Sequence, residues 1–249
     1  MSYKWNWGIF FQISPDGTYT YGQLLLFGAG WTLATALLAW IIALSAGAVV
    51  GVIRTSPVPW LVRIGNAYVE LFRNIPLLVQ MFLWYFVLPE LLPADLGDWL
   101  KQLPNASFYT AVVALGFYTS ARVAEQVRAG ILSLAGGQRM AALALGLTLP
   151  QTYAYVLLPM AYRIILPPLT SEFLNVIKNS AVALTIGLME LTARARAMQE
   201  FTFQVFEAFT AATVIYIVIN IVVTFAMRRL ERRVAVPGMI GAAPQAVSH

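Results

Sequence analysis

An uncharged stretch at residues 23–53 constrains this chain more than any other feature. No Asp, Glu, Lys or Arg interrupts this run, which is rich in Leu, Ala and Val. At about 1.5 Å per helical residue, it exceeds the roughly 30 Å hydrocarbon core of a bilayer. The stretch therefore predicts a membrane-spanning helix. Within it, Gly47 and Gly51 have the spacing of small residues that lets helices approach closely, and we expect them to pack inside the molecule.

The composition agrees with a chain dissolved in lipid. Of its 249 residues, 59% are hydrophobic and 11% charged, whereas soluble domains have about half and about a quarter. The formal net charge is +5, but the basic residues are scattered among apolar runs. A nucleic-acid partner would need a gathered basic surface, so none is expected.

This chain lacks the residues that several kinds of catalytic and metal-binding site need. The chain has no cysteine, and its only histidine is His249. A Ser–His nucleophile, a zinc site or a haem ligand set would therefore be very hard to assemble, and we assign no catalytic residue and no metal. None of the three lysines, Lys4, Lys101 and Lys178, follows the glycines of a phosphate loop. We expect that the chain is not an enzyme and that any ATP is bound by another subunit.

Four further apolar stretches bring the expected number of spans to five. They cover residues 66–88, 108–132, 163–189 and 208–227. Four arginines after the last stretch, within residues 228–233, mark its cytoplasmic end. The expected topology is N-out and C-in. The expected parts are an extracytoplasmic segment at residues 1–22, a transmembrane domain at 23–230 and a cytoplasmic tail at 231–249 that is disordered from Pro237 onward.

Charges interrupt the second and third stretches. Pairs spaced by three residues share one helix face, where opposite charges neutralise one another. They anchor the helices at the interface, form structural pairs, or act as a gate, and the sequence leaves these alternatives open. The residues concerned are Glu70, Arg73, Arg122, Glu125 and Arg128.

The fourth stretch carries a polar stripe. At 100° per residue its polar side chains fall within an arc of about 120°. The stripe either pairs with neighbours and holds helices together, or lines a translocation path in which Lys178 attracts an anionic solute. Pro167 and Pro168 disfavour regular helix just before it, so an opened helix is a further alternative. The stripe residues are Ser171, Glu172, Asn175, Lys178 and Asn179.

A short helix is expected in the cytoplasmic segment at residues 136–159. Its stop signals are Gly146 and Pro150. An apolar helix outside the bilayer needs a surface to cover it, either its own spans or a partner protein.

At this segment the chain resembles the membrane subunits of ATP-binding-cassette importers. Their signature is Glu-Ala-Ala, three residues, Gly, nine residues and Ile-x-Leu-Pro, and this chain has Ala141-Ala142, Gly146 and residues 156–159 at those spacings. Met140 stands where the family has Glu. The likeness extends over residues 28–190, in the polar amino acid branch. Residues 5–11 and 167–172 are similar to glutamate/aspartate permeases.

The resemblance implies a type I importer permease, an all-α, multi-pass protein of the bacterial inner (plasma) membrane. It implies two ATP-binding subunits that use ATP and Mg, a second permease that is either a related chain or a second copy, and an extracytoplasmic solute-binding protein. No cofactor is expected on this chain. The short cytoplasmic helix would be the coupling helix of this family, which is seated in a groove of the ATPase. It would transmit force from the ATPase during alternating access. Its residues would be Gln138, Arg139, Met140, Ala141, Ala142, Gly146, Leu147 and Pro150.

The alternative is an ion-coupled secondary transporter, which also uses polar stripes in broken helices. An odd number of spans and the lack of an internal repeat speak against it. The sequence leaves open which amino acid is carried, whether this subunit itself contacts the solute, and what Met140 changes.

Overall fold

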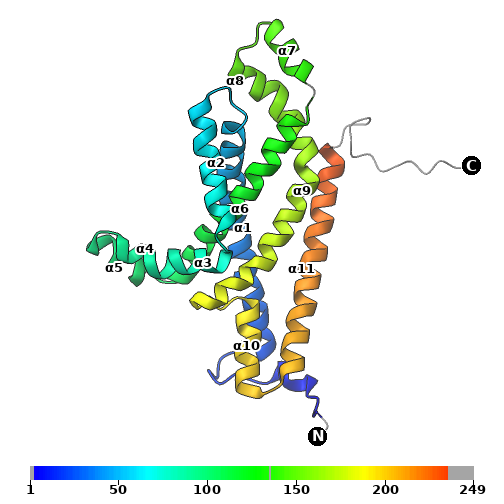
Figure 1. Ribbon diagram of the computed structural model, residues 1–249. Coiled ribbons are helices and arrows are strands. Elements are labelled where there is room, and N and C mark those ends of the chain that lie inside the picture. Colours follow the sequence, from blue (N-terminus) through cyan, green and yellow to red (C-terminus); the bar gives the residue numbers. More distant parts are fainter. Residues whose placement is uncertain (1–2, 135, 235–249) are drawn as a thin grey trace, which may run out of the picture.

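The computed structural model describes residues 3–134 and 136–234, which are mostly helical (Figure 1). The expected tail from Pro237 lies outside them. An isolated bridge between Ile13 and Thr20 is the one β pairing in the described ranges, so the all-α expectation is confirmed. The elements are η1 Trp7–Phe11, α1 Tyr21–Ile53, α2 Pro59–Asn74, α3 Leu77–Phe82, η2 Leu83–Val87, α4 Leu88–Leu91, α5 Ala94–Gln102, α6 Ala106–Leu132, α7 Gly136–Ala144, α8 Leu149–Thr152, η3 Tyr153–Leu157, α9 Leu158–Asn179, η4 Ser180–Ile186, α10 Leu191–Thr202 and α11 Val205–Val234.

Four long helices, α1, α6, α9 and α11, run side by side as a bundle. The short helices α7 and α8 lie at one end of the bundle, and η1 and α10 lie at the other (Figure 1). The segment from α3 to α5 extends sideways as an arm. The bundle therefore has two distinct ends and one lateral projection.

Two of these helices, α1 and α11, are long and apolar enough to cross a membrane. Two bent pairs raise the number to four if each pair counts as one span: Pro59–Asn74 with Leu77–Leu91, and Leu149–Ile186 with Leu191–Thr202. The helices expected at residues 23–53, 108–132 and 208–227 are present as α1, α6 and α11. The count of five spans stays a prediction.

Glycines allow α1 and α6 to pack backbone to backbone. A Cβ added at Gly47 would lie 2.6 Å from Val123, and one at Gly51 would lie 2.6 Å from Val127. No side chain fits at such distances, so the prediction that these glycines pack inside the molecule is confirmed.

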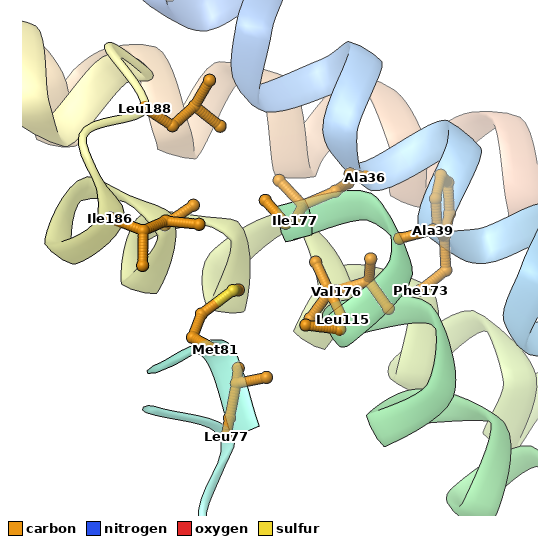
Figure 2. Packing of buried hydrophobic residues seen from close by; sticks show 13 residues of the cluster. Ala36, Ala39, Leu77, Met81, Leu115, Phe173, Val176, Ile177, Ile186 and Leu188 are labelled. Carbon is orange, nitrogen blue, oxygen red and sulfur yellow. The ribbon is translucent and has the colours of Figure 1, made fainter. Parts of the chain in front are cut away.

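The main buried cluster joins the arm to the bundle (Figure 2). Leu77 and Met81 of α3 pack with Leu115 of α6 and with Val176 and Ile177 of α9. Because Met81, Leu115, Val176 and Ile177 are fully buried, the base of the arm is held by dense apolar contacts.

The second expected span is not one straight helix, because the chain bends by 99° between α2 and α3. Ile75 is extended, with φ −91° and ψ 123°, since the ring of Pro76 disfavours helix in the preceding residue. The side-chain amide of buried Gln80 donates to the carbonyls of Phe72 and Ile75, at 2.8 and 2.9 Å. It thereby satisfies backbone groups that the break leaves free.

The opened helix considered at Pro167 and Pro168 is also wrong, because α9 runs through both prolines without interruption. Packing explains this. A Cβ added at Gly130 of α6 would lie 2.4 Å from Ile165, and Leu166 and Leu169 are buried beside it. The fourth expected span instead leaves α-helical geometry after the stripe, where η4 begins.

Candidate functional site

Two residues of the polar stripe of α9 line two separate hollows. Glu172 lines a cavity of about 380 Å³, here called the charged cavity, together with Arg73, Arg122, Glu125 and Gln126. Lys178 lines a second hollow of about 570 Å³, here called the α11 groove. Glu172 and Lys178 therefore do not pair with each other.

The charged cavity is built around Glu125 of α6. Its Oε1 accepts from Arg54 Nη2 and from Arg73 Nη1, each at 3.1 Å. The Arg54 side chain is only 7% exposed, and its Nε also donates to Asn66 at 2.8 Å. One carboxylate thus ties together α1, α2 and α6, and Arg54 depends on it because a buried guanidinium needs a partner.

The pairing of Arg122 with Glu172 is looser. Arg122 Nη1 lies 3.9 Å from Glu172 Oε2, which is longer than the 2.7–2.9 Å of a strong charge-assisted hydrogen bond. Arg122 also donates to the Tyr118 hydroxyl at 2.9 Å and stacks on that ring at 5.1 Å from its centroid. Glu172 Oε2 is buried without a hydrogen-bond partner.

The structure brings some predicted site residues together and leaves others apart. Arg73, Arg122, Glu125 and Glu172 meet in the charged cavity. Glu70 is exposed and forms no ion pair within the described residues. The predicted residues that line neither hollow are Glu70, Arg128, Ser171, Asn175 and Asn179.

The α11 groove combines Lys178 with a polar face of α11. Its lining consists of Lys178, Thr213, Tyr216, Ile217, Asn220, Ile221, Thr224, Phe225 and Arg228. Thr213, Asn220 and Thr224 each donate to the carbonyl four residues earlier, at 2.7 Å. The two threonine hydroxyl hydrogens are therefore used within the helix, as is common in membrane helices, whereas the Asn220 amide keeps a second N–H. The ammonium of Lys178 forms no salt bridge in the described part of the chain.

Three features around these hollows were not predicted from the sequence. Arg54, which pairs with Glu125, was not singled out as a site residue. The face of α11 could have been found, because 100° per residue places Thr213, Asn220 and Thr224 within about 40°. No pattern points to Glu190, which is fully buried. It caps α10 and accepts from the Tyr216 hydroxyl at 3.0 Å.

The short helix predicted after residue 136 is present as α7. It ends in a left-handed residue, Gly146, with φ +85°. Gly146 N donates to Leu143 O at 3.0 Å, and Leu147 N donates to Ala142 O at 3.2 Å. This is the Schellman arrangement, which glycine adopts most readily, so the motif glycine has a local structural reason.

Most of the α7 surface is open. Ala142 is buried and packs toward the body of the protein. Met140 is 67% exposed and Leu145 is 84% exposed. The helix thus folds back through Ala142 but leaves an apolar surface uncovered, a pattern typical of interaction sites. Of the other predicted coupling residues, Ala141, Gly146 and Pro150 are exposed, and Gln138, Arg139 and Leu147 are half-buried.

Sequence comparison identifies relatives over nearly the whole chain. Residues 43–236 match the family described as binding-protein-dependent transport system inner membrane component. The glutamate/aspartate import permease protein GltJ of Escherichia coli K12 is 50% identical over 97% of this chain and 99% of its own. The probable glutamine ABC transporter permease protein GlnM of Bacillus subtilis 168 is 37% identical over 79% of this chain and 88% of its own.

Solved structures agree with this assignment. A chain of an amino acid ABC transporter crystallised with histidines has a TM-score of 0.72 and 33% identity, covering 86% of this chain and 95% of that one. A chain of the MetNI methionine ABC transporter, in inward facing conformations, has a TM-score of 0.70 at 21% identity and shows the fold alone. This chain therefore belongs to the family of inner membrane components of binding-protein-dependent transport systems.

Proposed function

We propose that this chain is the permease subunit of an ATP-binding-cassette importer that moves glutamate or aspartate across the bacterial inner membrane. The observation that carries the proposal is the polar lining of the α11 groove, where Lys178 of α9 and the Thr and Asn side chains of α11 border one hollow. A polar face on otherwise apolar helices is costly against lipid, so it faces water or protein. A cation there lowers the cost of moving an anionic solute.

Topology follows from the distribution of basic residues. In the proposed orientation the chain crosses the membrane five times, N-out and C-in, with α7 at the cytoplasmic end. Residues 1–22 are then extracytoplasmic, residues 23–230 form the transmembrane domain, and residues 231–249 form a cytoplasmic tail. The α2–α3 and α9–α10 bends lie within the second and fourth crossings.

The partners follow from the family and from the open surface of α7. Two ATP-binding subunits would each use ATP and Mg and would seat α7, whose exposed Met140 and Leu145 offer the apolar contact. A second permease, either a related chain or a second copy, completes the path, and a solute-binding protein delivers the amino acid. Movement of α7 with the ATPase would switch the path between its two openings, which is alternating access.

An ion-coupled secondary transporter is the alternative function. It would use a broken helix at the membrane centre, but α9 is continuous through its polar stripe. Membership in a family of binding-protein-dependent systems also disfavours it.

Uptake into proteoliposomes tests the proposal. The vesicles would contain this chain with its neighbouring permease, ATPase and binding protein, and radiolabelled glutamate would be added with or without enclosed ATP. We expect uptake only with ATP, and competition by aspartate. Uptake that needs an ion gradient but no ATP would overturn the importer assignment.

The α7 contact has its own test. Leu145→Glu places a charge on the most exposed apolar side chain of this end, and we expect the ATPase to detach from the permease in pull-down assays. Leu132→Glu, the same substitution at another exposed leucine, the last residue of α6, is the matched control. An intact complex with Leu145→Glu would contradict the assigned surface.

A further inference from the structure

We propose that the arm binds a phospholipid whose headgroup carries a primary ammonium, as phosphatidylethanolamine does. One acyl chain would enter a cavity between the arm and α6, here called the arm pocket. Glu90 would accept from the headgroup ammonium, and Lys101 would donate to the phosphate. The arm pocket is separate from the charged cavity and the α11 groove, since none of their described lining residues is shared.

The arm pocket is a largely apolar hollow. Its volume of about 340 Å³ lies within the ~300–1,000 Å³ common for small-molecule sites. Elements η2, α4 and α5 of the arm form one wall, and the first turns of α6 form the other. The apolar and aromatic lining includes Trp84, Tyr85, Phe86, Leu100, Leu103 and Tyr109. Such a lining suits a hydrocarbon chain, because a hydrated solute would lose its hydrogen bonds to water there.

Packing inside the arm fixes the walls of the pocket. Trp84 stacks on Phe117 of α6, with ring centroids 5.6 Å apart and an interplanar angle of 5°. A Cβ added at Gly97 of α5 would clash with the carbonyl oxygen of Pro89 in α4, so these two helices meet backbone to backbone. A cavity whose walls are already placed costs a ligand less ordering on binding.

The arm has the composition of a segment at a membrane–water interface. Leu91 and Trp99 are 76% and 57% exposed, and the exposed charges of Glu90 and Asp98 lie next to them in the chain. Tryptophan together with charge is typical of the headgroup level. The helices that lead into the arm form one of the two bent pairs that pass as a broken span. The pocket therefore adjoins lipid, and acyl chains are the apolar molecules within its reach.

Charge selects among phospholipids. Glu90 and Lys101 are the charged residues of the described pocket lining, and their charges cancel. Lys101 Nζ lies 2.8 Å from Glu90 Oε1 and 3.7 Å from Asp98 Oδ1. An ammonium has three N–H donors and a carboxylate has two oxygens, so Lys101 can also donate to a phosphate while Glu90 Oε2 accepts from a ligand ammonium. A zwitterionic headgroup matches this pair, whereas an anionic headgroup would meet the carboxylates without a compensating ammonium.

Fluorescence quenching on the purified permease–ATPase complex in detergent tests the site. The probes are phosphatidylethanolamine, phosphatidylcholine and phosphatidylglycerol with the same brominated acyl chains, and the signal is the quenching that Trp84→Phe removes. Phosphatidylcholine has no N–H on its headgroup, and phosphatidylglycerol has no ammonium. We expect phosphatidylethanolamine to reach half-maximal quenching at a concentration about threefold to fivefold lower than either, the range of one exposed ion pair.

The headgroup contact is tested at Glu90. Glu90→Gln should bring phosphatidylethanolamine to within about 1.5-fold of phosphatidylcholine, because the charged acceptor is lost. Asp95→Asn is the matched control, since it changes an exposed carboxylate of the same arm that does not line the pocket, and it should keep the wild-type preference. A preference that survives Glu90→Gln, equal quenching by the three wild-type titrations, or tighter binding of phosphatidylglycerol would overturn the assignment.

The chain contact is tested by filling the pocket. Val113→Phe places a larger side chain in the pocket lining and should weaken all three lipids about tenfold or more, because the acyl chain loses its apolar contacts. Val49→Phe, at an exposed position on α1, is the control. Ala106→Phe, also in the lining, serves if Val113→Phe fails to fold. Quenching that survives the filled pocket, or no quenching of Trp84 by any lipid because the second permease covers the arm, would overturn the site.

Discussion

The charged cavity and the α11 groove differ in how their charges are satisfied. In the cavity, Glu125 holds two arginines at 3.1 Å, and one of them, Arg54, is nearly buried. In the groove, Lys178 is exposed and has no salt bridge among the described residues. The cavity charges therefore contribute to stability, because removing one leaves another buried and unpaired. Lys178 in the groove is free to act on a solute, and its removal leaves no buried charge without a partner.

The largest expected effect is on the cavity. Glu125→Leu removes the partner of the 7%-exposed Arg54 side chain and should lower the free energy of unfolding by about 3 kcal/mol. Unfolding of the detergent-solubilised protein measures this loss, with Glu70→Leu as the control on an exposed glutamate. Equal stability of the two variants would remove the proposed difference between cavity and groove.

A smaller loss of unfolding free energy is expected at the C-terminal end of α2, the helix that carries Arg73 of the charged cavity. Gln80→Leu keeps the apolar packing but leaves the carbonyls of Phe72 and Ile75 without their donors. The expected cost is about 2 kcal/mol in the same unfolding assay. Gln199→Leu, at a half-buried position on α10, is the control. A cost no greater than that of the control would mean that the bend does not need its cap.

In the groove, stability and transport should separate. Lys178→Met should change the free energy of unfolding by no more than about 0.5 kcal/mol, yet lower ATP-dependent glutamate uptake about tenfold, or about 1.4 kcal/mol. Lys178→Arg should restore much of the uptake because it restores the charge. Normal uptake by Lys178→Met would show that the groove cation does not act on the solute.

The smallest effect is expected at the exposed ion pair of the arm. Lys101 Nζ lies 2.8 Å from Glu90, and this hydrogen bond raises the pKa of Lys101. The pair is therefore stabilising below the ordinary lysine pKa of about 10.4, and this stabilisation is lost as pH rises through the raised pKa. Lys101→Ala should thus show the same small difference from wild type at pH 6 and pH 8, by thermal unfolding. A large difference would place this pair with the buried cavity charges.

Proline shows how far local sequence predicts this fold. Pro76 and the pair Pro167–Pro168 both predict a disturbed helix. At Pro76 the chain bends by 99°, and Gln80 satisfies the freed carbonyls. At Pro167 and Pro168 the helix continues, since Ile165 is pressed against Gly130 of a neighbouring helix. The same local signal has two outcomes because distant residues decide which conformation packs better.

The candidate site, too, was predictable from the sequence only in part. The stripe on α9 was found from its period, and the cavity charges were named from the cost of charge in lipid. Which of these residues lie together in one hollow could not be predicted from the sequence. Glu172 points to α6 and Lys178 to α11, and a helix one turn longer or rotated would have paired them differently. Arg54 reaches Glu125 because α1 packs on α6 at Gly47 and Gly51.

The sequence by itself determined that this chain is helical, apolar and built for a membrane, and that α7 stops just before Gly146. These properties depend on local backbone preferences and on transfer of side chains into lipid, which act on each segment alone. The tertiary structure decided the bend at Pro76, the continuity of α9 and the separation of Glu172 from Lys178. Those features depend on contacts between segments far apart in the chain, where packing and charge pairing outweigh local preference.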